Sequence, residues 1–288
     1  MLRVLKDYYR IEVDYIENGY FQYNHLYYYI MMCDEQFLSL YSHYDFMIHL
    51  LNIKGYRIVK NCFNQIFSQN YVLFCYENET VDIKQYLTIS LKNIPNNELF
   101  INQIKEGWIQ KIDMVRNEIC KYSYSFQYDR DLNALMHYYC GLAENGIGVL
   151  NEIIKIQKNA RLPLSLSLKQ KIEPYFYQLL NPSNYTISTR SKHVLYLLKS
   201  QIISFDDFVE LIEQSYFHVY ELLYLYARAF YCPDFFNCVL SDCISDKMIS
   251  YYLMEYKEDL EFLKKLRKVL TKFISLPEIS WIEQKNMI

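Results

Sequence analysis

Glycine and proline, the residues that most often interrupt secondary structure, are scarce in this sequence, which has 6 of each among 288 residues. Collagen-like and Gly/Pro-rich disordered architectures are therefore excluded, because their compositions depend on these residues. Hydrophobic residues make up 52% of the chain and aromatic residues 17%. Such a chain can bury a substantial core, either as one large domain or as two smaller ones.

An excess of one charge is also missing. The formal net charge is −3, and residues of both signs are spread along the chain. The sequence therefore lacks the basic surface typical of a nucleic-acid-binding protein. It has no run of about 18 uncharged apolar residues, and its first residues lack the apolar core of a signal peptide. We expect a cytoplasmic protein with no membrane span and no nucleic-acid partner.

Paired cysteine motifs are absent. None of the 8 cysteines belongs to a CxxC pair, so the sequence predicts neither a zinc site nor a redox motif. Cys232, Cys238 and Cys243 follow His218 at spacings that match no known metal site. We expect them to be small buried thiols. P-loop, Rossmann, GxSxG and HExxH motifs are missing as well.

Tyrosine is abundant, with 31 copies. Exposed tyrosines could bind sugars or become cross-linked, but a tyrosine also packs well when only its hydroxyl reaches water. Packing is the simpler interpretation of most of these residues.

The first part of the chain shows a mixed α/β pattern. Asn18-Gly19 is a strong hairpin signal, and Asn24-His25 is a second turn. We expect strands at residues 10–16, 20–23, 26–32, 56–59, 64–67 and 71–76, and a helix capped by Asp34 that ends near residues 54–55. Residues 77–82 are polar and predict a linker. The sequence therefore predicts one domain over residues 1–82 and a second over residues 83–288.

The second part is helical almost throughout. Apolar residues recur at three- and four-residue steps. The expected helices span residues 83–92, 97–122, 131–158, 194–199, 205–231, 235–241 and 246–275.

The helix expected at residues 131–158 is the most informative of these. Asp131 is a plausible N-cap, and the apolar stripe predicts burial. Gly141, Gly146 and Gly148 are unusual, since each costs about 1 kcal/mol relative to alanine inside a helix. They suggest either a neighbouring element packed against the backbone or a local break. His137, beside the apolar stripe, is expected to be a structural histidine rather than a metal ligand.

Three stretches carry a resemblance to a known family: YYCGLAENGIGVL (residues 138–150), LNPSNYTISTRSKHVLYLLKS (residues 180–200) and LYARAFYCPDFF (residues 225–236). With LPEISW (residues 276–281) and the order of elements, they make the chain resemble the spore-coat kinase-like proteins of the CotS and YutH type. These proteins belong to the aminoglycoside and choline phosphotransferase-like superfamily. The resemblance implies an α+β, two-lobed protein-kinase-like fold, with a small antiparallel β-sheet N-lobe carrying one helix and a larger, mainly α-helical C-lobe.

The resemblance also says which catalytic parts an active member needs. A glycine loop should cover the phosphates between the first two strands, where this chain has only Asn18-Gly19. A strand lysine should reach the phosphates, but residues 26–32 contain none, and Lys54 and Lys60 lie outside that strand. The His-x-Asp loop is missing from residues 160–180. The resemblance implies a strand at residues 185–189, where Ser188 stands in place of the expected magnesium-binding aspartate.

Few acidic residues remain that could replace these groups. Between Glu152 and Asp206 the only acid is Glu173, which could be a substitute base. Asn181 and Asn184 are expected to hold a loop turn. Arg190 and His193 could belong either to a fold contact or to a residual anion site.

We therefore predict a catalytically inactive, kinase-like protein, a pseudokinase with no catalytic, cofactor-binding or metal-binding residues and no cofactor. It would act as a binding or scaffold protein with protein partners, in spore-coat assembly in a low-GC Gram-positive bacterium. Nucleotide binding should be weak or absent, and the protein would be located in the mother-cell cytoplasm or the coat. The alternative is a divergent small-molecule phosphotransferase that uses Glu173 or another acid brought in by folding.

Overall fold

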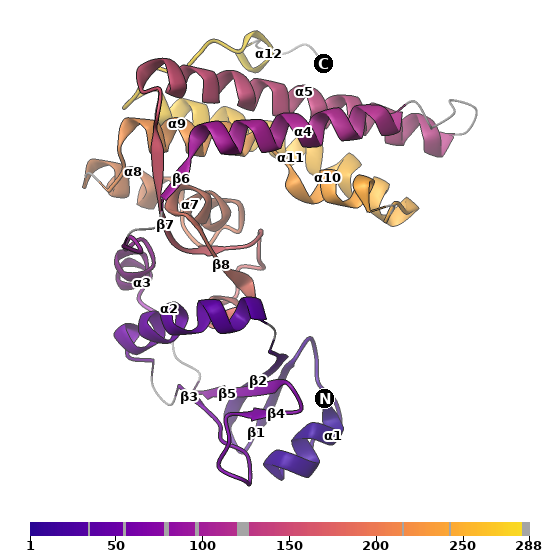
Figure 1. The fold of residues 1–288 in the computed structure, drawn as a ribbon, viewed down its shortest axis with the longest axis vertical. Helices are drawn as coiled ribbons and strands as arrows, with labels where there is room; N and C mark the ends of the chain where they lie inside the picture. Colours follow the sequence, from indigo (N-terminus) through magenta and orange to yellow (C-terminus); the bar gives the residue numbers. More distant parts are fainter. Residues whose placement is uncertain are drawn as a thin grey trace. The chain divides into compact units, whose positions relative to one another are not determined.

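The computed structural model describes residues 1–33, 35–53, 56–77, 81–95, 98–119, 127–214, 216–241 and 243–283. The chain divides into two compact units, one made of Met1–Ile94 and Ser165–Ile202, the other of Pro95–Leu164 and Ile203–Ile288 (Figure 1). The boundary expected between residues 82 and 83 falls inside the first unit, and the division into lobes stays a prediction.

An antiparallel sheet forms the N-terminal part of the first unit (Figure 1). Its strands are β1 (Tyr20–Tyr23), β2 (Leu26–Met32), β3 (Arg57–Ile58), β4 (Phe67–Ser68) and β5 (Tyr71–Tyr76). The strand order is β1-β2-β5-β3, and β4 pairs with β5. The expected strands at 20–23, 26–32 and 71–76 are confirmed. Both predicted turns are confirmed too, since Asn18, Gly19, Asn24 and His25 all have positive φ, as type I′ hairpin turns require.

Two of the expected strands are wrong. Residues 10–16 form no strand; the chain begins with helix α1 (Leu2–Val4) and a π-helical turn, η1 (Leu5–Tyr9), which ends at Arg10 in the left-handed conformation. Residues 64–66 form a loop. The buried Asn61 organises this loop, because its Oδ1 accepts a hydrogen bond from the Gln65 backbone N–H (2.8 Å) and its Nδ2 donates to Ser68 Oγ (2.9 Å).

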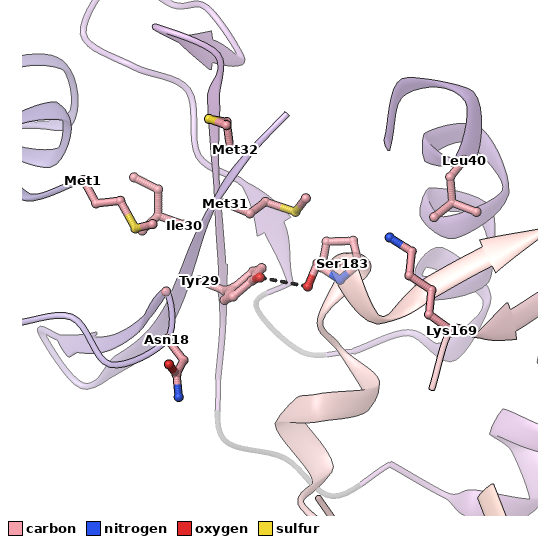
Figure 2. Close-up of a pocket in the computed structure, with 11 residues that line it drawn as sticks. Met1, Asn18, Tyr29, Ile30, Met31, Met32, Leu40, Lys169 and Ser183 are labelled. Atoms are coloured by element: carbon pink, nitrogen blue, oxygen red, sulfur yellow. Dashed lines mark hydrogen bonds between the residues drawn. The ribbon is translucent and has the colours of Figure 1, made fainter. Parts of the chain in front are cut away.

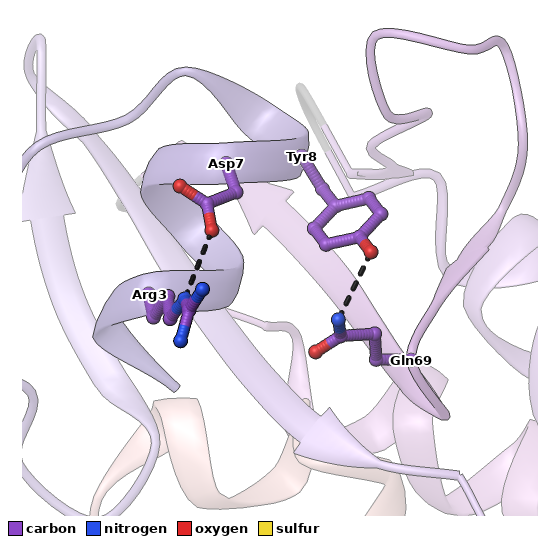
Figure 3. Close-up of polar contacts among 4 residues, drawn as sticks. All are labelled: Arg3, Asp7, Tyr8 and Gln69. Carbon is purple, nitrogen blue, oxygen red and sulfur yellow. Dashed lines mark hydrogen bonds and ion pairs between the residues drawn. The ribbon is translucent and has the colours of Figure 1, made fainter.

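The N-terminal helical segment packs on one face of the sheet. Leu5 and Val4 join a buried cluster with side chains of β1, β2 and β5, among them Phe21 and Ile30. One polar contact lies within this segment and a second joins it to the turn between β4 and β5 (Figure 3). Arg3 pairs with Asp7 at 3.2 Å, and the Tyr8 hydroxyl accepts a hydrogen bond from Gln69 Nε2 at 2.9 Å.

The rest of the first unit is built from helices and one later stretch of chain. It comprises α2 (Glu35–Leu51), α3 (Ile83–Ser90), the end of β7 (Arg161–Leu168), α6 (Phe176–Leu179), the 3₁₀ turn η2 (Pro182–Asn184), β8 (Tyr185–Thr189) and α7 (Arg190–Lys199). Asp82 caps α3 by accepting hydrogen bonds from two backbone N–H groups. The expected strand at 185–189 is confirmed. The predicted caps and ends at Asp34 and residues 54–55 lie outside the described residues.

The second unit is mainly helical. Its elements are β6 (Glu98–Phe100), α4 (Ile101–Ile119), α5 (Gln127–Ile156), α8 (Phe205–Glu213), α9 (Val219–Ala229), α10 (Pro233–Leu240), α11 (Asp246–Leu270) and α12 (Ser280–Glu283). Figure 1 shows α4 and α5 side by side, and α5 also packs against α9. β6 pairs antiparallel with the first residues of β7.

Three helix predictions need correction. The helix expected at 131–158 begins four residues earlier, at Gln127, so Asp131 is not its N-cap. The helix expected at 97–122 is preceded by β6 and starts at Ile101; its predicted end lies outside the described residues. The helix expected at 205–231 is two helices, α8 and α9, because an N-terminal cap at His218 starts a new helix.

The three glycines of α5 differ in their surroundings. A Cβ added at Gly146 would lie 2.8 Å from the backbone oxygen of Ala227 in α9, so close packing at this glycine is confirmed. A Cβ at Gly141 or Gly148 would meet nothing within 4 Å. The helix passes through all three without a break. Only Gly146 therefore has a packing reason to be glycine.

None of the helices in the described ranges combines the length and the apolar character needed to cross a lipid bilayer.

Candidate functional site

The segment that follows β7 in the first unit contains the candidate site. The last four residues of β7, which ends at Leu168, are buried, and the chain then continues through α6 and η2 into β8. This is the part of the chain in which the resemblance places the catalytic loop and the metal-binding aspartate. Ser188 lies in β8, half-buried, and Glu173 is exposed in the loop before α6.

A cavity of about 270 Å³ lies beside this segment, and we call it the Lys169 cavity (Figure 2). The Asn18-Gly19 turn and β2 form one wall, and Lys169 with residues of η2 forms another. The lining residues are Met1, Asn18, Gly19, Tyr29, Ile30, Met31, Met32, Leu40, Lys169, Pro182 and Ser183. Most of these side chains are apolar, so the few polar groups decide what the cavity can bind.

Lys169 is the only lysine, arginine, histidine, aspartate or glutamate among the described lining residues. It is the first residue after β7, it is half-buried, and its side chain extends toward the side of the cavity where Leu40 and Ser183 lie (Figure 2). Its ammonium forms no ion pair with any described residue. A partly desolvated cation without a counter-charge favours an anionic ligand group.

A short chain of hydrogen bonds crosses the cavity wall. The Tyr29 hydroxyl lies 3.0 Å from Ser183 Oγ (Figure 2), and Ser183 Oγ donates to Asn181 Oδ1 at 2.7 Å. Because the Ser183 proton is used in this way, Tyr29 is the donor to Ser183. Asn181 Oδ1 also accepts from the Ser183 backbone N–H at 2.9 Å, and Asn184 Nδ2 donates to the Gln178 carbonyl at 2.8 Å. The predicted role of Asn181 and Asn184 in holding a loop turn is confirmed.

Carboxylates are missing from the described lining of the Lys169 cavity. Across the described ranges, no group of three or more His, Cys, Asp or Glu side chains is placed to hold a metal ion. Magnesium requires oxygen ligands, and protein sites for nucleotide-bound magnesium usually supply one or two carboxylates. The described residues of this cavity therefore do not fit a magnesium–nucleotide complex.

His193 is buried in α7 and does not line the Lys169 cavity. Its side chain has no exposed surface, and burial lowers its pKa to about 3, with a further contribution from Lys192. Its Nδ1 accepts a hydrogen bond from the Leu168 backbone N–H at 3.0 Å, so the neutral ring carries its proton on Nε2. A neutral histidine that is already hydrogen-bonded cannot serve as an anion site, so His193 belongs to a fold contact.

Two tyrosines continue this hydrogen-bonded chain. His193 Nε2 donates to the Tyr86 hydroxyl at 3.2 Å, and the Tyr86 and Tyr185 hydroxyls lie 2.7 Å apart. Tyr185 donates to the Leu179 carbonyl at 2.8 Å, which leaves Tyr86 as the donor to Tyr185. Each of the three side chains is fully buried. The series of hydrogen bonds that runs from the Leu168 N–H through His193, Tyr86 and Tyr185 to the Leu179 carbonyl therefore has one consistent set of donors and acceptors. It connects the end of β7 to α3, α6 and α7.

The other residues singled out in the sequence lie apart from the Lys169 cavity. Arg190, at the start of α7, is half-buried and is not among the cavity-lining residues. His137 is exposed on α5, so the expectation of a structural histidine there is wrong, because the helix register turns this residue to solvent. Cys243 is exposed, while Cys232 and Cys238 are half-buried, so these three are not the buried thiols we expected.

Sequence reasoning missed Lys169 as a candidate. The signal was present, since Lys169 is the first charged residue after an eight-residue strand that ends in buried positions. What the sequence could not show is that a hairpin more than a hundred residues earlier closes a cavity around it.

No known protein-family model matches this sequence, and no curated protein matches it. Among solved structures, the crystal structure of an aminoglycoside phosphotransferase from Alicyclobacillus acidocaldarius is similar, with a TM-score of 0.52 and 9% sequence identity over 88% of this chain and 92% of that one. At this identity the similarity concerns the fold alone. The CotS and YutH subfamily therefore stays a prediction. The predicted fold class is confirmed: the chain has an α+β fold with an N-terminal antiparallel sheet and a mainly helical C-terminal part, matching the kinase-like fold of aminoglycoside phosphotransferases.

Proposed function

We propose that this chain is a pseudokinase, a kinase-like protein that has lost phosphotransfer and acts as a binding or scaffold protein in the assembly of a spore coat. One observation carries the loss of activity. In the part of the chain where a kinase-like enzyme needs its catalytic and metal-binding acids, residues 153–205, the only acid is Glu173, and its side chain is exposed outside the Lys169 cavity lining.

The electrostatics of phosphoryl transfer explain why this matters. Metal ions bridge the phosphate oxygens, and carboxylates hold those metal ions in place. Serine at position 188 is neutral and cannot replace a magnesium carboxylate. A single catalytic acid or base is often worth about 10²–10⁴-fold in rate, so loss of both acids removes most of the activity.

The binding role rests on what the fold retains. The Lys169 cavity keeps a defined shape, with a glycine turn on one side and a hydrogen-bonded wall of Tyr29, Ser183 and Asn181 on the other. Lys169 supplies positive charge without any described carboxylate to bind a metal. A site of this kind is suited to a metal-independent anionic group on a ligand or on a protein partner. The coat-assembly role rests on the sequence resemblance to spore-coat kinase-like proteins.

The loss of activity can be tested by thermal-shift titration with ATP, with and without magnesium. We expect magnesium to add nothing to any rise in the melting temperature, because no acid in the described cavity lining can hold the metal. Any small metal-independent rise should disappear in Lys169→Met. It should persist in Lys171→Met, which removes an exposed lysine two residues away. A magnesium-dependent rise together with phosphate transfer to an amino alcohol or a sugar would establish the phosphotransferase alternative instead.

The coat-assembly role needs its own test in a spore-forming host. A fluorescent fusion of the full chain should assemble at the surface of the developing spore. A fusion that stays dispersed in the mother cell throughout sporulation contradicts this role without bearing on the loss of phosphotransfer.

A further inference from the structure

A second cavity, of about 590 Å³, lies beside the β1–β2 hairpin, and we call it the hairpin cavity. One wall is the extended segment of residues 12–17, which leads into the Asn18-Gly19 turn. The other wall is formed by β1, β2 and the end of β5. All of its lining residues belong to the first unit, and none of them lines the Lys169 cavity.

The lining of the hairpin cavity is unusually aromatic. It contains the tyrosines at positions 15, 20, 23, 27, 28 and 76 and the phenylalanine at position 21. The Tyr27 and Tyr76 rings lie 5.9 Å apart and are nearly parallel, and Tyr15 is 74% exposed. The face of an aromatic ring attracts a cation placed within about 6 Å of its centroid.

The charged groups in the lining are all negative. Glu12, Asp14 and Glu17 line the cavity, and none of the lining residues is lysine or arginine. Glu12 is held by Lys6 at 2.9 Å. Asp14 and Glu17 form no ion pair with any described residue, so two exposed carboxylates remain uncompensated beside the aromatic wall.

Arg57, which does not line the hairpin cavity, lies close enough to affect the pKa of Tyr28 in its aromatic wall. Burial raises the pKa of the Tyr28 hydroxyl, and Arg57 opposes that rise. Arg57 is exposed, pairs through its backbone with β5, and forms no ion pair with Asp14 or Glu17.

We propose that the hairpin cavity binds a small organic cation, of the aliphatic diamine class. Two observations point independently to this chemistry. The aromatic faces favour a positive group with an apolar body, and the two uncompensated carboxylates favour a ligand with two ammonium groups. The cavity volume is within the range of small-molecule sites. This binding does not depend on the pseudokinase proposal, because no residue between positions 153 and 205 lines the hairpin cavity.

The test is isothermal titration of the full chain at low ionic strength with two ligands of matched length, 1,4-diaminobutane and 1,4-butanediol. We expect the diamine to bind and the neutral diol to bind at least about tenfold more weakly, since only the diamine carries charge. Affinity for the diamine should also fall as salt is raised. Equal binding of diol and diamine, or binding of methyl glucoside without binding of the diamine, overturns the proposal.

Substitutions in the lining test whether the diamine binds in the hairpin cavity. Glu17→Gln and Asp14→Asn should each weaken diamine binding by about fivefold or more, and Tyr15→Leu should weaken it through loss of an exposed ring. Glu106→Gln, an exposed carboxylate in the second unit, is the control and should bind as the unmodified chain does. Because Asp14, Tyr15 and Glu17 are exposed, we expect all three variants to fold, and melting curves check this. Diamine binding that survives all three cavity variants rules the hairpin cavity out.

Discussion

Replacing Gly146 by alanine is expected to lower the free energy of unfolding by about 1–3 kcal/mol, the cost typical of inserting a methyl group into a packed core. The new Cβ would lie 2.8 Å from the backbone oxygen of Ala227 and 3.2 Å from the Trp108 ring. A backbone atom cannot rotate away as a side chain can, so α5 and α9 must separate locally. The measurement is chemical denaturation of the variant and the unmodified chain.

Gly148→Ala is the matched control for this prediction. It adds the same methyl group to the same helix two residues further on, where nothing lies within 4 Å. Alanine is a better helix former than glycine, so this variant should gain about 0.5–1 kcal/mol. Gly141→Ala should behave in the same way, because its Cβ also meets open space. If Gly146→Ala and Gly148→Ala change stability in the same direction, the close approach of α5 to α9 is wrong.

Acid should destabilise the protein through His193, which is the second large effect. The folded pKa of His193 is about 3, lowered mainly by burial, whereas an unfolded histidine has a pKa of about 6.5. Between these values the unfolded chain binds one more proton than the folded chain. The stability that the neutral ring contributes is therefore complete above about pH 6.5 and falls by up to about 1.4 kcal/mol per pH unit as the pH drops toward 3.

The contribution of His193 can be isolated by comparison. His193→Gln should be less stable at neutral pH, because the Leu168 backbone N–H and the Tyr86 hydroxyl lose well-placed partners, and its stability should depend less on pH between 6.5 and 4. His137→Gln, which removes an exposed histidine, should keep the full dependence of the unmodified chain.

The protonation state of His193 can also be measured in the unmodified chain, without any variant. In the unmodified chain, the imidazole nitrogens of His193 should give the NMR signals of a neutral ring with the proton on Nε2 down to about pH 4. If the His193 ring titrates near pH 6.5, it is not buried and hydrogen-bonded to Tyr86.

Several parts of the fold could be predicted from the sequence because their information is local. The turns at Asn18-Gly19, before β1, and at Asn24-His25, between β1 and β2, follow from residues that tolerate positive φ. The strand at 71–76 and the helical character of the second unit follow from short-range patterns, whereas the strand at 185–189 is implied by the family resemblance. The errors were also local in origin. Residues 10–16 alternate like a strand, and Ile11, Val13 and Ile16 do pack against the buried cluster of the sheet, but alternation reports burial on one side and not whether the backbone pairs with a neighbouring strand.

The sequence by itself determined that Glu173 is the only acid in residues 153–205, because folding does not change the composition of a segment. Only the tertiary structure decided which residues meet. It brought Lys169 to the β1–β2 hairpin, buried His193 against two tyrosines, and distinguished Gly146 from Gly148. These outcomes depend on contacts between segments far apart in the chain, and the periodicity of any one segment carries no information about its partner.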